Sequence, residues 1–160
     1  MKRIEAILQD ERFRYGLQQI AKLEQQRIFC CHGLEHLLDV ARIAWIMTLE
    51  QHLPLEKDIV YGAALLHDLG RYQQYEHQIP HHEASAALAL EILPDAGYSL
   101  EETAMITAAI LRHSSCRQEE QQLLADVLYQ ADKLSRNCFQ CKAQADCKWP
   151  EEKRNRTIYC

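Results

Sequence analysis

Apolar residues recur at spacings of three and four along most of the chain, which is the pattern of amphipathic helices. The first such pattern covers residues 2–29 and predicts one or two helices. Further helices are predicted over residues 33–51, 55–69, 81–93, 100–113 and 118–136. Ser99 and Glu102 form a capping-box pattern at the start of one of them. Residues 72–80 are polar and aromatic, end in a proline, and are predicted to form a loop or short turn.

The composition favours an all-helical protein. Only 5 glycines and 4 prolines occur among 160 residues, and Leu, Ala, Glu and Gln dominate. An apolar fraction of 48% is ordinary for a globular protein and allows a sizeable core. We therefore expect one all-α helical bundle over residues 1–137, with a short cysteine-containing basic tail over residues 138–160.

The formal net charge of −5 argues against a general nucleic-acid-binding surface. The charge is unevenly distributed, because residues 133–160 hold seven Lys and Arg against three Asp and Glu, a balance of +4 that leaves −9 for the rest. This basic segment could present positive charge to an anionic ligand. The alternative is an ordinary solvated surface.

No stretch of the chain approaches the roughly 18 apolar residues of a membrane span. The first five residues lead into a charged helix and lack the apolar core of a signal peptide. A cytoplasmic location without membrane association is the resulting expectation. The seven cysteines are then expected to be thiols or metal ligands rather than disulfides.

Three cysteines in the tail, Cys138, Cys141 and Cys147, are spaced like metal ligands, and Cys160 follows them. They could hold a structural zinc ion or an iron–sulfur cluster. A fourth ligand could then come from Cys30, Cys31 or Cys116. The alternative is that reduced cysteines pack the tail aromatics, Phe139 and Trp149, against the body of the protein.

The clearest chemical signal is a His-Asp pair at the end of an apolar run. Neutral imidazole and ionised carboxylate are both metal ligands, so a divalent ion is the simplest partner for His67 and Asp68. Gly70 suits a helix C-terminus, where a left-handed residue is often needed. Arg71 places a positive charge just outside the pair.

Other histidines and an aspartate interrupt or end apolar helical faces. His36 lies beside such a face, and His32, four residues earlier, makes a His-x-x-x-His metal pair an alternative. We rank His36 first because His32 falls at the start of the helix. Asp132 lies within an apolar stripe, which is costly unless it pairs with Lys133 or Arg136 or binds a metal. Together the candidates could build a metal site inside a bundle: His36, His67, Asp68, one of His81 and His82, His113 and Asp132.

The order of His36, the His67-Asp68 pair and Asp132 resembles the signature of the HD-domain superfamily of metal-dependent phosphohydrolases. The surrounding segments match too, and the resemblance covers roughly residues 27–137: His36 to Ala44 resembles the first-ligand helix, Leu65 to Arg71 the namesake motif and Tyr129 to Leu134 the final-ligand helix. It implies an HD-domain helical bundle that hydrolyses a phosphate ester or anhydride, expected to be that of a nucleotide.

Two further histidines resemble ligands of HD-domain proteins with five or six metal ligands. His81 is similar to a family histidine that is followed, after three residues, by a small residue and Ala, with His82 as second choice, and His113 is similar to the other added histidine. They imply a two-metal site, as in the bacterial branch that includes diadenosine tetraphosphatases and in the cyclic-di-GMP phosphodiesterases. The chain lacks the Gly-Tyr-Pro element of the latter, and residues 133–137 differ from the Glu-Pro-Asn-Arg-type continuation of the former.

The ligand types predict how such a site would work. One or two divalent ions (iron, manganese or zinc) would lower the pKa of a bound water, with Asp68 bridging two ions. Arg71, Arg112 and Lys133 adjoin ligands and are candidates for stabilising phosphate charge, or else form surface ion pairs. The expected partner is a small phosphorylated substrate. The alternatives are a di-iron oxygenase-type HD protein and a non-enzymatic module that senses nucleotide or metal.

Overall fold

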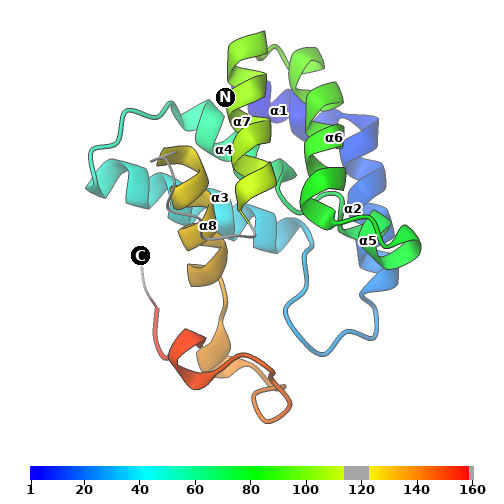
Figure 1. Ribbon diagram of the computed structural model, residues 1–160, viewed down its shortest axis with the longest axis vertical. Coiled ribbons are helices and arrows are strands. Elements are labelled where there is room, and N and C mark those ends of the chain that lie inside the picture. The colour runs from blue at the N-terminus through cyan, green and yellow to red at the C-terminus, as the bar shows by residue number, and fades with distance from the viewer. Residues whose placement is uncertain (114–122, 159–160) are drawn as a thin grey trace.

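The computed structural model describes residues 1–113 and 123–158, and all regular structure in these ranges is helical (Figure 1). The expected all-α bundle is confirmed. The α-helices are α1 (Lys2–Gln9), α2 (Glu11–Leu23), α3 (Leu34–Glu50), α4 (Lys57–Leu66), α5 (Arg71–His77), α6 (His81–Asp95), α7 (Leu100–Arg112) and α8 (Leu123–Leu134). Two short 3-10 helices follow in the tail, η1 (Cys138–Gln140) and η2 (Glu151–Lys153). None of the helices described is both long and apolar enough to cross a membrane.

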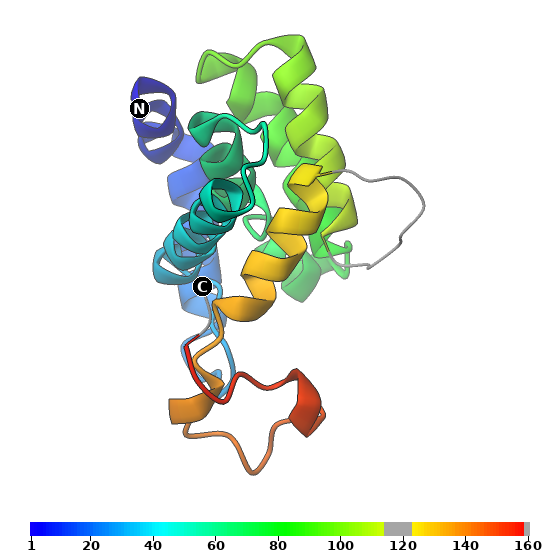
Figure 2. The same cartoon turned by 90° about the vertical axis from the view of Figure 1, so that its left-hand side faces the viewer.

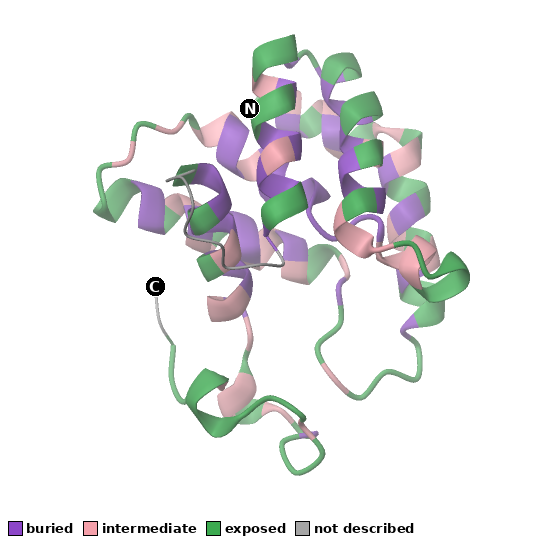
Figure 3. Ribbon diagram, in the orientation of Figure 1, coloured by how far each residue is buried: buried purple, intermediate pink, exposed green. Residues whose placement is uncertain are grey.

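Helix α4 forms the centre of the bundle. It is buried from Ile59 to Leu66 except at Tyr61, because its sequence is apolar almost all round, and such a helix must be enclosed on every side. Helices α1, α3, α6, α7 and α8 all pack against it. Figure 3 shows buried positions gathered where the helices meet. The four residues that directly follow α4, His67 to Gly70, are buried as well.

Capping residues fix where two of the surrounding helices begin. The Asp10 carboxylate accepts hydrogen bonds from the backbone N–H groups of Arg12 (2.8 Å) and Phe13 (3.4 Å) and so starts α2. The predicted capping box is present at α7, where Ser99 and Glu102 exchange hydrogen bonds between side chain and backbone. These contacts satisfy backbone donors that a helix start otherwise leaves free.

The segment after α4 differs from expectation in two ways. Residues 72–80 are not simply a loop, because residues 71–77 form α5, which ends at Gln78 with a left-handed φ of 59°. Gly70 has a φ of −78°, so it is not the left-handed residue that was expected. It is required for space instead: a Cβ atom there would lie 2.4 Å from the Ser85 nitrogen and 2.6 Å from the Ala84 Cβ.

The tail docks on the C-terminal end of α8. The Asn155 amide donates to the carbonyls of Lys133 (2.9 Å), Leu134 (3.1 Å) and Arg136 (2.8 Å), which lack helical partners. The Arg136 guanidinium lies 3.9 Å from the centre of the Trp149 ring. Figure 2 shows the tail below the end of α8. The predicted helix over 118–136 is seen from Leu123 to Leu134, and residues 118–122 lie outside the described residues.

Candidate metal centre

Asp68 is the centre of a histidine cluster. It follows α4, and its side chain is only 1% exposed. Five imidazole Nε2 atoms lie within 4 Å of its carboxylate. Those nearest Oδ2 belong to His67 (3.5 Å), His36 (3.6 Å) and His32 (3.9 Å), and those nearest Oδ1 belong to His81 (3.5 Å) and His113 (3.7 Å). The two carboxylate oxygens therefore face two different sets of histidines.

The first group with the geometry of a metal site consists of His36 from α3, His67 and Asp68 after α4, and Asp132 from α8. One potential ligand atom from each residue lies within 4.8 Å of the others. His36 Nε2 connects the two carboxylates, because it lies 3.6 Å from Asp68 Oδ2 and 3.5 Å from Asp132 Oδ1. Three packed helices thus bring together residues nearly 100 positions apart.

The second group consists of Asp68, His81 at the start of α6 and His113 at the end of α7. Of the two adjacent histidines on α6, His81 faces Asp68, whereas His82 Nε2 lies 4.0 Å from Glu83 Oε1. Asp68 belongs to both groups and is the geometrically suited bridge between them. Every residue of the predicted ligand set is thus placed in one of the two groups.

The unpaired nitrogen atoms test whether a metal would fit. His36 Nε2 and His67 Nε2 are buried and make no hydrogen bond within the described structure. Their distances to Asp68, 3.6 and 3.5 Å, are too long for good hydrogen bonds. Two ligands about 2.1 Å from one ion can be up to about 4.2 Å apart, so the same distances suit atoms that share an ion. The donor set of imidazoles and carboxylates therefore fits a divalent metal.

Contacts to the other ring nitrogen fix the orientation of the ligand-candidate histidines. His67 Nδ1 lies 2.7 Å from the Ala64 carbonyl and His113 Nδ1 lies 2.5 Å from the Ile110 carbonyl. A carbonyl oxygen only accepts hydrogen bonds, so both Nδ1 atoms carry hydrogen. A neutral ring then has its Nε2 lone pair directed at Asp68, as a metal ligand requires.

The electrostatics of the cluster favour neutral imidazoles and ionised carboxylates. Burial lowers the pKa of His67 to about 4, against the opposing effect of Asp68. Burial and then the Arg71 charge lower the pKa of His81 to about 3. Burial alone would raise the pKa of both aspartates, but the neighbouring imidazoles, first that of His67, and the Arg71 guanidinium hold that of Asp68 well below its usual value. His67 and Lys133 bring the pKa of Asp132 to about 2. These are the protonation states that bind metal.

Two of the three predicted cations contact a candidate ligand. Arg71 holds both oxygens of Asp68, with Nε 3.1 Å from Oδ1 and Nη2 3.3 Å from Oδ2. Lys133 pairs with Asp132 Oδ2, and Arg136 Nη2 lies 3.7 Å from the same oxygen. Arg112 is exposed at the end of α7, beside His113. The charge pairing considered for Asp132 therefore exists alongside its place in the first metal group.

Sequence reasoning missed the contribution of α5. Besides Arg71, this helix supplies Gln74, whose Oε1 lies 3.0 Å from His81 Nδ1, and Tyr75, whose hydroxyl donates to Glu24 Oε1 at 2.6 Å. Glu24 in turn holds His32, which was ranked below His36. The signal available was the spacing of Arg71, Gln74 and Tyr75, which places all three on one face if the segment is helical.

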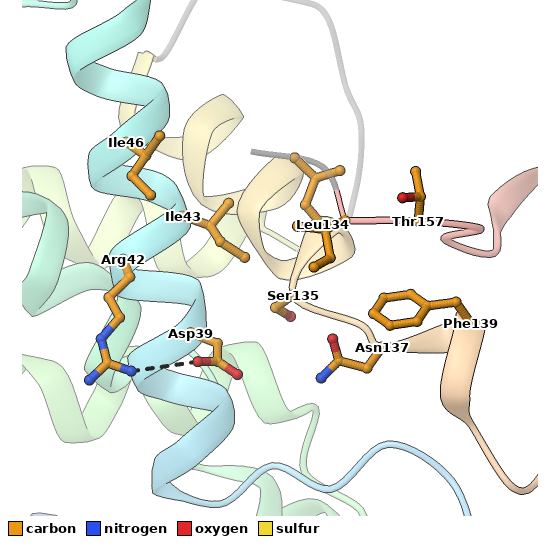
Figure 4. Close-up of a pocket in the computed structure, with 10 residues that line it drawn as sticks. Asp39, Arg42, Ile43, Ile46, Leu134, Ser135, Asn137, Phe139 and Thr157 are labelled. Atoms are coloured by element: carbon orange, nitrogen blue, oxygen red, sulfur yellow. Dashed lines mark ion pairs between the residues drawn. The ribbon is translucent and has the colours of Figure 1, made fainter.

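A hollow of about 230 Å³ lies outside this centre, between α3 and the tail (Figure 4). Its walls are largely apolar and include Ile43, Ile46 and Phe139, with an Asp39–Arg42 ion pair at 3.7 Å. None of the metal-candidate residues lines it. One of its lining residues, Ser135, contacts the centre, with Oγ 3.3 Å from His36 Nδ1. The chemistry therefore belongs to the histidine cluster rather than to this hollow.

The geometry can be compared with known proteins. The sequence model of the HD domain matches residues 33–137, which is more than half of the chain. The chain belongs to the HD-domain family. This HD-domain protein is similar to an uncharacterized protein of Clostridium beijerinckii, with 43% identity over 159 residues that cover 99% of both chains. In fold it is similar to the crystal structure of a predicted HD superfamily hydrolase from an uncultured Thermotogales bacterium, with a TM-score of 0.63 and 22% identity over 88% of this chain and 80% of that one.

Proposed function

We propose that this HD-domain protein is a metal-dependent phosphohydrolase that cleaves a phosphate ester or anhydride of a small, nucleotide-like substrate. The observation that carries the proposal is the pair of ligand groups sharing Asp68, with His36, His67 and Asp132 on one side and His81 and His113 on the other. Two adjacent sites joined by one carboxylate suit hydrolysis at phosphorus, because both the attacking and the leaving oxygen need stabilisation.

The metals would supply a hydroxide nucleophile near neutral pH by lowering the pKa of a bound water. The protein's own residues would hold and orient the reacting groups. Arg71 fixes both oxygens of the proposed bridge, Asp68, and brings a positive charge to the rim of the centre. Lys133 pairs with one oxygen of Asp132, Oδ2, and also brings a positive charge to the centre. We propose that both stabilise negative charge on phosphate; for Arg112 that role rests only on its place next to His113.

The substitution Asp68→Ala tests the proposal. We expect it to abolish metal loading and phosphate release while leaving helical content largely intact, because it removes the residue common to both groups. The matched control is Asp39→Ala, which removes a partly exposed aspartate of α3 that lies outside the histidine cluster. Metal per chain is measured by elemental analysis, and phosphate release is measured from nucleotides and from a generic aryl phosphodiester. Unchanged turnover in Asp68→Ala would refute the proposed site.

The same measurements distinguish the two alternative functions. Turnover that requires oxygen, with bound iron and no phosphate release, would identify a di-iron oxygenase. Tight nucleotide binding without turnover, after reconstitution with iron, manganese and zinc in turn, would identify a sensor. Phosphate release without oxygen would support the hydrolase and contradict both. Iron or manganese at about two atoms per chain would fit both ligand groups.

The second metal site expected in the tail stays a prediction. Cys138 begins η1 and Cys141 directly follows it. Burial raises the pKa of Cys30; Arg136 opposes this effect, and Cys138 and Cys141 add to it. Neither of the two ligand groups found among the described residues contains a cysteine, and Cys116 and Cys160 lie outside those residues. Zinc that is lost from Cys141→Ala while the core metal remains would support a separate tail site. Loss of all metal would show that the two sites are not separable.

A further inference from the structure

A fifth histidine, His32, faces the proposed metal centre from outside its two ligand groups. It precedes α3, is only 7% exposed, and points Nε2 at Asp68 Oδ2 from 3.9 Å. This is the carboxylate oxygen nearest to His36 and His67. Yet His32 belongs to neither group of mutually close ligand atoms. Its Nε2 therefore lies at the edge of the centre, further from Asp68 Oδ2 than the Nε2 atoms of His36 and His67.

The orientation of His32 is fixed by Glu24, the residue that follows α2. Glu24 Oε2 accepts from the His32 backbone N–H at 2.7 Å, and Oε1 lies 2.5 Å from His32 Nδ1. Tyr75 on α5 donates to the same Oε1 at 2.6 Å. Because an ionised carboxylate only accepts hydrogen bonds, Nδ1 is the donor and Nε2 is left to face the centre. A buried histidine held in this way by Glu24 and Tyr75, from two other segments, is not ordinary packing.

We propose that His32 is a substrate-binding residue that carries hydrogen on both ring nitrogens when phosphate is bound, so that Nδ1–H donates to Glu24 and Nε2–H donates to a phosphate oxygen at the metal centre. Glu24 is its positioning residue. The inference rests on the proposed function, since it requires that phosphate binds there. A separation of 3.9 Å is too long for a direct hydrogen bond to Asp68 and leaves Nε2 available to a group bound at the centre. It deepens the proposal by assigning phosphate recognition to a residue outside the metal ligands.

Substitution by asparagine isolates the Nε2 atom. The amide nitrogen of asparagine occupies about the place of Nδ1, so His32→Asn keeps a donor for Glu24 but removes the group that faces the centre. The matched control is His77→Asn, which makes the same change at an exposed position at the end of α5. A second variant, Glu24→Gln, keeps an acceptor for Nδ1 but removes the charge. Far-UV circular dichroism and urea unfolding establish that each variant is folded.

Two quantities are measured on the full chain after loading with manganese: metal per chain by elemental analysis, and the Kd of inorganic phosphate by calorimetry. We expect His32→Asn to keep the wild-type metal content and to weaken phosphate binding about tenfold, as loss of a hydrogen bond to a charged group implies. Glu24→Gln should weaken phosphate binding less, again at unchanged metal content. His77→Asn should match the wild type in both.

Each other outcome contradicts the inference in a distinguishable way. Loss of metal from a folded His32→Asn would make His32 a metal ligand rather than a phosphate contact. Unchanged phosphate affinity with unchanged metal would make it a packing residue and would leave the hydrolase proposal intact. Wild-type protein that binds manganese but no phosphate would overturn this inference together with the proposed function.

Discussion

Replacement of Gly70 by alanine tests how the turn after α4 positions the centre. Gly70 is the second residue after Asp68, and its backbone lies against the first turns of α6. An added Cβ would be 2.4 Å from the Ser85 nitrogen and 2.6 Å from the Ala84 Cβ, both much closer than van der Waals contact. The Gly70 N–H also donates to Ser85 Oγ at 2.8 Å. Neither neighbour is the end of a flexible side chain, so backbone must move.

The expected cost can be worked from these contacts. Overpacking of a buried methyl group destabilises proteins by about 1–3 kcal/mol. Loss or weakening of the hydrogen bond to Ser85 adds about 1 kcal/mol. Gly70→Ala should therefore lower the free energy of unfolding by about 2–4 kcal/mol, or the melting temperature by on the order of 10 °C for a chain of this size. The shift of α6 should also carry His81 away from Asp68 and weaken the second ligand group.

Urea unfolding of metal-free protein measures the first effect, and manganese titration measures the second. The control is Gly33→Ala, because a Cβ at Gly33 would have no atom within 4 Å. That change should alter stability by less than about 1 kcal/mol. A Gly70→Ala variant as stable as Gly33→Ala would refute the close approach of this turn to α6. A destabilised variant with full metal content would show that α6 does not move when the turn does.

Two further predictions concern stability away from the centre. The pKa of Asp10 is lowered mainly by its hydrogen bond with the Arg12 side chain and also by hydrogen bonds from the α2 backbone, against the opposing effect of burial. The ionised carboxylate therefore stabilises the fold fully above its unfolded pKa of about 4. This stabilisation is lost as the pH falls through the lower pKa of the folded state. Asp10→Ala should thus cost about 1 kcal/mol in urea unfolding at pH 7 and less at pH 3, and an equal cost at both would exclude a role for the charge. Asn155→Ala should cost about 1–2 kcal/mol and speed cleavage of the tail by protease, because two α8 carbonyls and that of Arg136 lose a donor. A cleavage rate equal to that of the wild type would show that other contacts hold the tail.

Most of the fold could be predicted because most helices carry a continuous apolar stripe. The capping box at Ser99 gave the start of α7 to the residue. Helix α5 could not be predicted in this way, since none of its residues is buried and its sequence has no apolar face. Its helical form depends on polar contacts to residues far away in the sequence, such as that of Tyr75 with Glu24. The spacing of apolar residues along the chain carries no information about polar contacts between distant segments.

Most candidate ligands could be found from sequence because each polar residue stands within or at the end of an apolar run, whereas His81, at the start of α6, was chosen by its resemblance to a family histidine. That position places His67, Asp68 and His113 in the interior as soon as their helices pack. His32 has no such apolar run before it. It was ranked below His36 because it falls at the start of the predicted helix. Its burial depends on Glu24 and Tyr75, from two other elements. A residue that is placed by tertiary contacts alone carries no local sequence signal.

The support of the centre is concentrated in one short segment. Arg71, Gln74 and Tyr75 project from α5 to Asp68, His81 and Glu24 respectively, and through Glu24 to His32. The two ligand groups and the proposed phosphate contact thus share a single polar helix as their outer support. The orientation of α5 is set where it begins, at Gly70, which is pressed against α6. Because a side chain at that point would displace the helix from the residues it holds, the glycine after the His-Asp pair is explained by close packing and not by a left-handed turn.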